Sequence, residues 1–114
     1  MQHFVVGPVL NPEYEVVEVT VGDPMILEVN VTEFNLEIEE VFWTRNGVEI
    51  IDGMNSTVII NSSLEAPVGM VALIVDPVES PLIHGGLYQV TVSNSVGNTS
   101  SYFVIHIRCK LKFH

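Results

Sequence analysis

The strongest constraint on the fold of this chain is an alternation of apolar and polar residues that recurs along its length. The runs MILEVNVT and LYQVTVS show it most clearly, and their alternate apolar members are Leu27, Val29, Val31, Tyr88, Val90 and Val92. A period of two residues places alternate side chains on one face of a half-buried β-strand. No window keeps a helical period of 3.6 residues for three turns, so the chain is predicted to be all-β.

Turn-forming residues divide this pattern into short segments. They occur at Gly22-Asp23-Pro24, Asn46-Gly47, Gly85-Gly86 and Val96-Gly97-Asn98. The segments between them predict nine strands, near residues 4–10, 15–21, 25–32, 38–45, 48–51, 57–61, 70–76, 86–95 and 99–108. Such spacing is typical of two antiparallel sheets packed face to face, with a two-residue hairpin turn at the Asn-Gly pair.

Length and charge narrow the classes of function. With 114 residues, 47% of them hydrophobic, the chain is long enough for one domain with a substantial core. We assign that domain to residues 1–108 and a tail or linker to residues 109–114. The 4 Lys and Arg against 14 Asp and Glu give a net charge of −10. This charge argues against nucleic acid as a partner and against direct contact with an anionic membrane.

The order of several motifs resembles the immunoglobulin superfamily, most closely its I-set. Gly22 precedes the strand of Leu27-Glu28-Val29, Trp43 precedes a short turn, and residues 85–97, GGLYQVTVSNSVG, match the pattern around the family's late tyrosine. The resemblance covers nearly the whole chain and implies a Greek-key β-sandwich with a buried Trp43. It also implies a tyrosine corner, in which the Tyr88 hydroxyl bonds to backbone upstream.

Two departures from the family pattern affect the core. Val29 and Val90 stand where the family has cysteines, and His84 stands where it has an acid. A bridge between the sheets would close a loop of about 60 residues, worth roughly 4 kcal/mol in the chain-entropy model. We predict that the two valines face each other beside Trp43 and Tyr88, where apolar packing, at about 1.5–3 kcal/mol per buried Val or Leu, offsets the missing bridge. The long segment between Trp43 and Tyr88 leaves an extra edge strand or a V-like arrangement open.

Four Asn-x-Ser/Thr sequons bear on the cellular compartment. They begin at Asn30, Asn55, Asn61 and Asn98, where chance predicts about one. Glycosylation at these residues would place the chain outside the cell, in the ectodomain of a single-pass membrane protein. The alternative is a cytoplasmic, titin-like domain with accidental sequons. Cysteine usage does not separate the two compartments, because the single cysteine, Cys109, cannot form an internal disulfide in either case.

The sequence contains no constellation that points to catalysis, so we predict neither an enzyme nor a cofactor. His3, His84, His106 and His114 lack the short spacing of zinc ligands, and Cys109 has no cysteine partner. No nucleophile elbow or phosphate-binding loop is present. The parent protein could still carry a separate catalytic domain, such as a tyrosine kinase.

One face of the predicted sandwich has the composition of a binding surface. In the family the outer face of the C, F and G strands often binds partners, and alternation places there Phe42, Thr44, Gln89, Thr91, Tyr102 and Val104, with His106 nearby. Aromatic residues are enriched at the centres of interfaces, and we expect the sequons to leave this CFG face free of glycan. We therefore predict a receptor or adhesion module whose protein partner is a second copy of itself or a receptor ligand, beside neighbouring immunoglobulin-like domains in the parent protein. The alternative is an intracellular, titin-like structural module.

Overall fold

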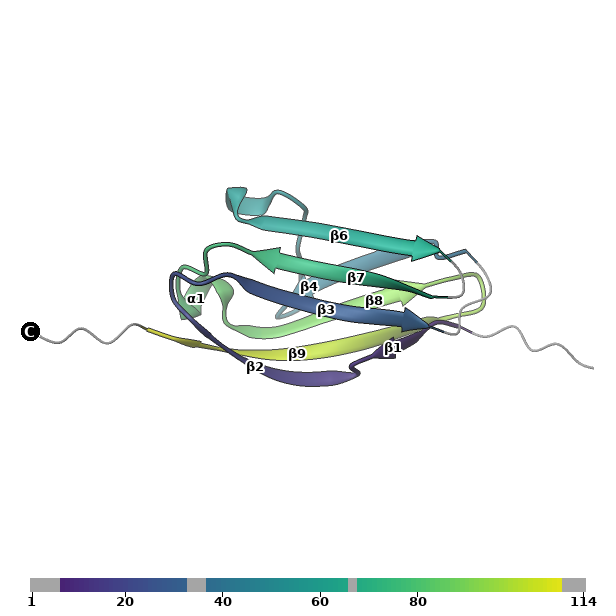
Figure 1. Ribbon diagram of the computed structural model, residues 1–114, viewed down its shortest axis with the longest axis horizontal. Helices are drawn as coiled ribbons and strands as arrows, with labels where there is room; N and C mark the ends of the chain where they lie inside the picture. Colours follow the sequence, from purple (N-terminus) through teal and green to yellow (C-terminus); the bar gives the residue numbers. More distant parts are fainter. Residues whose placement is uncertain (1–6, 33–36, 66–67, 110–114) are drawn as a thin grey trace, which may run out of the picture.

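The computed structural model describes residues 7–32, 37–65 and 68–109, which form two layers of strands (Figure 1). The strands are β1 Val9–Asn11, β2 Tyr14–Thr20, β3 Met25–Thr32, β4 Glu40–Arg45, β5 Val48–Glu49, β6 Val58–Glu65, β7 Val68–Val75, β8 Gly86–Ser93 and β9 Asn98–Arg108. The predicted all-β sandwich is confirmed. Residues 4–6, where the first strand was predicted to begin, lie outside the described part of the chain.

The two layers have different strand orders. One sheet has the order β1-β3-β7-β6 and the other has β2-β9-β8-β4-β5. The chain passes between them at Pro12, which has no backbone N–H to continue the ladder of β1. Because β2 is entered by this switch and not by a hairpin, it runs parallel to β9, from Tyr14 beside Tyr102 to Thr20 beside Arg108. The second sheet is therefore mixed, which corrects the prediction that both sheets are wholly antiparallel.

The core lies between the layers, where the inward side chains of both sheets meet. The largest side chains with less than 2% exposure are Trp43, Tyr88, Phe103, Met25, Leu27, Leu73, Val29, Val31, Val71, Val75 and Val78. Burial alternates along β3 as the period of two predicts. The rings of Trp43 and Phe103 stack with their centroids 6.3 Å apart and their planes at 27°, so β4 and β9, which lie on either side of β8 in the sheet, share one aromatic contact in the core.

The β4–β5 hairpin turns at Asn46-Gly47, as predicted. Both residues have positive φ, 49° and 84°, which is the backbone that this two-residue turn requires. Asn46 also joins the turn to β8, because its Oδ1 accepts a hydrogen bond of 2.9 Å from the Leu87 N–H. Gly86 makes this approach possible: its φ is 120°, and a Cβ there would lie 2.6 Å from Asn46 Oδ1.

Two short helical elements connect the strands at one end of the sandwich. They are the 3-10 turn η1 Met54–Ser56, between β5 and β6, and the helix α1 Pro81–His84, before β8. The extra length between Trp43 and Tyr88 forms these elements and the long strands β6 and β7; the described residues between β5 and β6 add no further strand. None of the described helices has the length and apolarity to cross a membrane.

Candidate protein interface

The six predicted interface residues lie on the outer face of β4, β8 and β9, which correspond to the C, F and G strands. They are Phe42, Thr44, Gln89, Thr91, Tyr102 and Val104. The strand register places Phe42 beside Thr91, Thr44 beside Gln89, and Gln89 beside Tyr102. Phe42 and Tyr102 are 37% and 39% exposed, and the other four are half-buried. These six residues are the CFG face below.

Strand β2 widens the CFG face on the far side of β9. The sequence pattern did not predict this extension. Parallel pairing sets Tyr14 beside Tyr102 and Val16 beside Val104. Tyr14 and Val16 are 61% and 52% exposed, and Leu87, opposite Val104 on β8, is 43% exposed. We call the CFG face together with Tyr14, Val16, Leu87 and Ser100 the extended face.

The extended face carries no charged side chain, although the chain has 14 acidic residues. Among the described residues, the titratable and charged side chains that border it in the ladder are Glu18, His106 and Arg108 at one end, Glu40 at the other, and Glu49 beyond β4. Glu18 and Arg108 form an ion pair in which both side chains are more than half exposed. An uncharged, aromatic centre within a charged border is the composition that distinguishes protein interfaces from other surfaces.

Hydrogen bonds hold the polar side chains in the middle of the extended face. The hydroxyl oxygens of Thr91 and Ser100 lie 2.8 Å apart, and Gln89 Nε2 donates to Ser100 Oγ at 3.1 Å. Side chains that are already ordered lose less conformational entropy when a partner binds. The middle of the face is therefore pre-organised between its apolar neighbours.

All four sequon asparagines have exposed side chains. Asn30 on β3 and Asn61 on β6 lie on the outer face of the other sheet, and Asn55 lies in η1. Asn98 begins β9, and alternation puts its side chain on the same side as Tyr102. Asn98 therefore borders the extended face at the β8–β9 hairpin, and the expectation that the CFG face is free of glycan stays a prediction.

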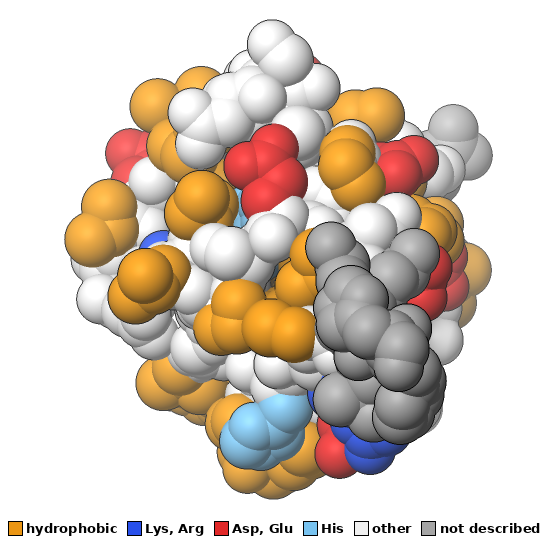
Figure 2. Space-filling view, turned by 90° about the vertical axis from the view of Figure 1, so that its left-hand side faces the viewer, with side chains coloured by type: hydrophobic (Ala, Val, Ile, Leu, Met, Phe, Trp, Pro, Cys, Tyr) orange, Lys and Arg blue, Asp and Glu red, His pale blue; other side chains and the backbone are white. Residues whose placement is uncertain are grey.

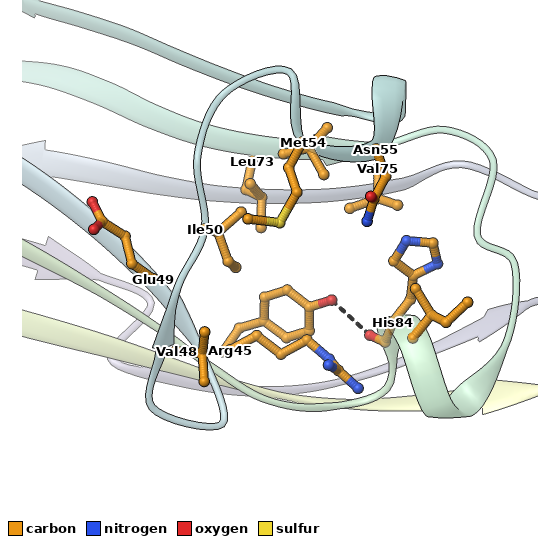
Figure 3. A pocket seen from close by; sticks show the side chains of 12 residues that line it. Arg45, Val48, Glu49, Ile50, Met54, Asn55, Leu73, Val75 and His84 are labelled. Atoms are coloured by element: carbon orange, nitrogen blue, oxygen red, sulfur yellow. Dashed lines mark hydrogen bonds between the residues drawn. The ribbon is translucent and has the colours of Figure 1, made fainter.

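The residues predicted for the centre of the core come from both sheets and are buried together. Val29 on β3 and Val90 on β8 are 0% exposed, Trp43 and Tyr88 are 1% exposed, and all four belong to one buried cluster. The Tyr88 hydroxyl donates to the His84 carbonyl at 2.6 Å (Figure 3), which is the bond of a tyrosine corner. Burial raises the pKa of Tyr88 to about 12, so this hydroxyl remains a donor.

His84, which stands where the family has an acid, is buried at the end of α1. The residue is 5% exposed, and its Nδ1 accepts a 2.9 Å hydrogen bond from the Glu79 N–H. Arg45 holds the same corner from β4, with Nε donating to the Gly85 carbonyl at 2.7 Å and Nη2 to the Leu82 carbonyl at 2.6 Å. Burial lowers the pKa of His84, while Glu79 raises it and Arg45 lowers it.

The signal that could have revealed α1 lies just before it. Ser80 is a favoured N-cap residue and Pro81 a favoured first helical residue. In the structure Ser80 Oγ accepts a hydrogen bond of 3.2 Å from the Ile83 N–H. A helix that starts at Ser80-Pro81 would include His84, so this signal predicts a helical position for His84.

Because His84 is buried as a neutral acceptor, stability is expected to decrease as the pH falls from about 7 to about 5. The folded-state pKa lies below the ordinary 6.5. The unfolded chain therefore takes up a proton first, and stability is lost until the pH has passed through the folded-state pKa. Thermal midpoints across this range should decrease less in His84→Gln than in the wild type. His106→Gln, at an exposed position, should keep the full decrease; an equal decrease in all three proteins would contradict this role.

The other titratable candidates do not gather around these residues. His3 and His114 lie outside the described residues, and His106 and Cys109 are exposed. Within residues 7–32, 37–65 and 68–109, no three His, Cys, Asp or Glu side chains lie close enough together to hold a metal ion.

Solved structures share this architecture at low sequence identity. Titin domain M7 is 21% identical with a TM-score of 0.69, over 89% of this chain and 93% of that one. The titin Ig tandem domains A164-A165 are 19% identical with a TM-score of 0.77, over 93% of this chain and 51% of theirs. Dpr2 Ig1-Ig2, in complex with DIP-Theta Ig1-Ig3, gives 16% identity and a TM-score of 0.77, over 90% of this chain and 33% of that one.

These likenesses show the fold. The chain is an immunoglobulin-like β-sandwich, as its motifs predicted, and it spans about half or a third of the multidomain structures it matches. No protein-family profile and no curated protein sequence matches it.

Proposed function

We propose that this immunoglobulin-like chain is a protein-binding module of a cell-surface receptor or adhesion protein, and that its partner binds the extended face. The observation that carries the proposal is an uncharged, aromatic surface on a chain whose net charge is −10. Residues 1–108 form the module in this proposal, and residues 109–114 connect it to a neighbouring domain.

The exposed apolar side chains of the extended face supply the binding free energy. Tyr14, Phe42 and Tyr102 offer three rings across β2, β4 and β9, and a buried interface aromatic often costs about 2 kcal/mol or more when truncated. The carboxylates at the border favour a partner that presents Lys or Arg around an apolar centre, and they make association faster at low salt.

Two further observations support a role outside the cell. The four sequon asparagines are exposed, and one similar structure, Dpr2, is a complex of immunoglobulin domains with a protein partner. The second candidate is an intracellular, titin-like structural module, which the likeness to several titin domains favours. Glycosidase-sensitive mass on the parent protein after expression in a secreting cell would separate these two candidates.

Charge on the extended face is expected to abolish binding without unfolding the chain. The variant Phe42→Glu/Tyr102→Glu introduces two carboxylates into the centre of the face, where neither has a cationic neighbour on the ladder. Binding to a panel of recombinant immunoglobulin-domain ectodomains and self-association by sedimentation velocity measure the effect, with at least a tenfold loss expected from two lost anchors.

The matched control places the same charges on the outer face of the other sheet. Ile26→Glu/Ile59→Glu changes side chains that are 56% and 49% exposed, so it adds equal charge at similar exposure. This control should bind as the wild type does, and both variants should keep a thermal midpoint close to the wild-type value. Binding that survives in Phe42→Glu/Tyr102→Glu would reject the extended face.

A further inference from the structure

An exposed tyrosine lies between two acidic residues at the start of β2. The sequence there reads Glu13-Tyr14-Glu15, and all three residues are exposed. Tyr14 is 61% exposed, compared with 39% for Tyr102 and 37% for Phe42, the other exposed rings of the extended face. An enzyme can therefore reach the Tyr14 phenol from solvent.

Strand β2 is also an edge strand. It begins the sheet order β2-β9-β8-β4-β5 and lies along the margin of the sandwich in Figure 1. One side of β2 pairs with β9, and the described residues place no strand on its other side. A free edge lets an extended segment bind to another protein through main-chain hydrogen bonds. The segment around Tyr14 is thus held in a form that the active site of a peptide-modifying enzyme can bind.

The charges around Tyr14 indicate the kind of group that it accepts. Enzymes that transfer sulfonate or phosphoryl groups bind a phosphate-bearing donor, and Lys and Arg are the side chains that bind phosphates. A basic active site of this kind attracts an acidic segment, and it also attracts the whole chain, whose net charge is −10. Glu13 and Glu15 therefore favour Tyr14 as an acceptor of such a group.

The other two tyrosines lack these features. Tyr102 lies on β9, which is paired on both sides, and its sequence neighbours Ser101 and Phe103 are uncharged. Tyr88 is 1% exposed, and its hydroxyl donates to the His84 carbonyl. Of the three tyrosines in the chain, the one on β2 alone lies on a sheet edge between two acids.

The apolar end of the sandwich offers no competing phenol. Figure 2 faces the end that carries η1 and α1 and shows hydrophobic side chains spread across it. The exposed large hydrophobic residues of β5, of the segment after it and of α1 are Val48, Ile51, Leu82 and Ile83. None of them has a hydroxyl group, so the exposed tyrosines are confined to the extended face.

We infer that the phenol oxygen of Tyr14 is a sulfation site, an inference that rests on the proposed function because tyrosine sulfation takes place along the secretory route. A tyrosine-directed sulfotransferase catalyses the transfer, and phosphoadenylyl sulfate supplies the sulfonate group. The phenol oxygen forms a bond to sulfur, the bond from that sulfur to the donor's phosphate breaks, and the nucleotide leaves as an adenosine bisphosphate. The phenol proton passes to a base of the transferase.

The sulfate would place a negative charge on the extended face, which has no charged side chain of its own. Tyr14 is paired with Tyr102 there, so the charge lies beside one of the exposed rings. Sulfate oxygens accept charge-assisted hydrogen bonds from Lys and Arg, the residues that the proposed partner presents around its apolar centre. Sulfation should therefore strengthen binding about tenfold, the ratio that one charge-assisted hydrogen bond supplies.

The first test treats the purified, folded chain with a recombinant tyrosylprotein sulfotransferase and radiolabelled phosphoadenylyl sulfate, followed by peptide mapping. The label is expected on Tyr14. Tyr14→Phe should abolish the transfer, whereas the matched control Tyr102→Phe should keep it. This assay does not depend on any protein partner. No transfer to the wild type, or transfer that persists in Tyr14→Phe, would overturn the inference.

The acidic neighbours have their own test. Glu13→Gln/Glu15→Gln keeps the size and exposure of both side chains and removes their charge. The initial rate of sulfation should decrease by about tenfold or more, the range that charge steering supplies. Glu37→Gln/Glu39→Gln, which removes equal charge from a segment without a tyrosine, should keep the rate. Equal rates in all three proteins would contradict recognition of Tyr14 through its acidic neighbours.

Expression in secreting cells distinguishes sulfate from phosphate on the same oxygen. Sulfate is expected as the added mass of one SO₃ group on the Tyr14 peptide, and it should disappear when chlorate blocks synthesis of the donor. An added group that resists chlorate and is removed by a phosphatase would overturn sulfation and would favour the intracellular candidate.

The effect on binding is measured with the sulfated and unsulfated chain on the same panel of immunoglobulin-domain ectodomains. About tenfold tighter binding of the sulfated form is expected. Equal binding of the two forms would overturn the effect of the sulfate on the partner. Absence of binding by both forms would count against the proposed function, whereas the transfer assay alone decides whether Tyr14 is the sulfation site.

Discussion

Replacing Val29 and Val90 together by cysteine is expected to crosslink the two sheets and to raise the free energy of unfolding by about 2–4 kcal/mol. The two side chains are fully buried in one cluster, on the central strands β3 and β8 of opposite sheets. A bridge between them closes a loop of about 60 residues, and a crosslink of that length strongly restricts the unfolded chain. Urea unfolding under oxidising conditions measures the gain.

The protein that carries Val29→Cys and Val90→Cys needs one further substitution. Cys109 is exposed and free, so the experiment uses Cys109→Ser to prevent pairing with it. The reduced double variant is the control, and it should be slightly less stable than the parent because a thiol replaces two methyl groups. Two thiols that remain titratable after oxidation in the folded protein would show that the valines do not face each other as the family's cysteines do.

The sequence predicts the core well because local alternation and burial agree in the central strands. In β3 and β8 each inward residue is Val, Leu, Tyr or Met, apart from Gly86 at the start of β8. Each outward residue is polar, apart from Ile26 and Leu87, which are exposed. The Asn46-Gly47 turn is equally local, since its positive φ values depend on two residues alone. These features need no knowledge of which strands pair.

The candidate site was predicted only in part because its remainder depends on pairing between distant segments. Tyr14 and Val16 lie on the extended face only because β2 joins β9, at a separation of 88 residues between Tyr14 and Tyr102. The run EVVEV contains adjacent valines, so alternation alone does not decide which of them points outward. The burial of His84 likewise depends on how α1 turns the residue inward, which does not follow from a periodic pattern.

Replacing Arg45 by methionine is expected to lower the free energy of unfolding by about 2–3 kcal/mol, because it removes two charge-assisted hydrogen bonds that are partly exposed to solvent. Arg45 binds the carbonyls of Gly85 and Leu82, which are among the last acceptors of α1. A methionine keeps most of the apolar stem but leaves these carbonyls without their donor. The loss should appear as a lower urea midpoint with an unchanged slope.

Arg108→Met is the matched control, because it removes the same group from the same sheet. Arg108 pairs with Glu18 at the surface, where both side chains are more than half exposed, and such pairs contribute about 0–1 kcal/mol. Faster hydrogen exchange at the Glu79 and Gly85 amides should accompany Arg45→Met alone, because those amides bond to His84 and Pro81 within the corner that Arg45 holds. Equal destabilisation by the two variants would mean that exposed charge, and not the anchoring of α1, determines the contribution of Arg45.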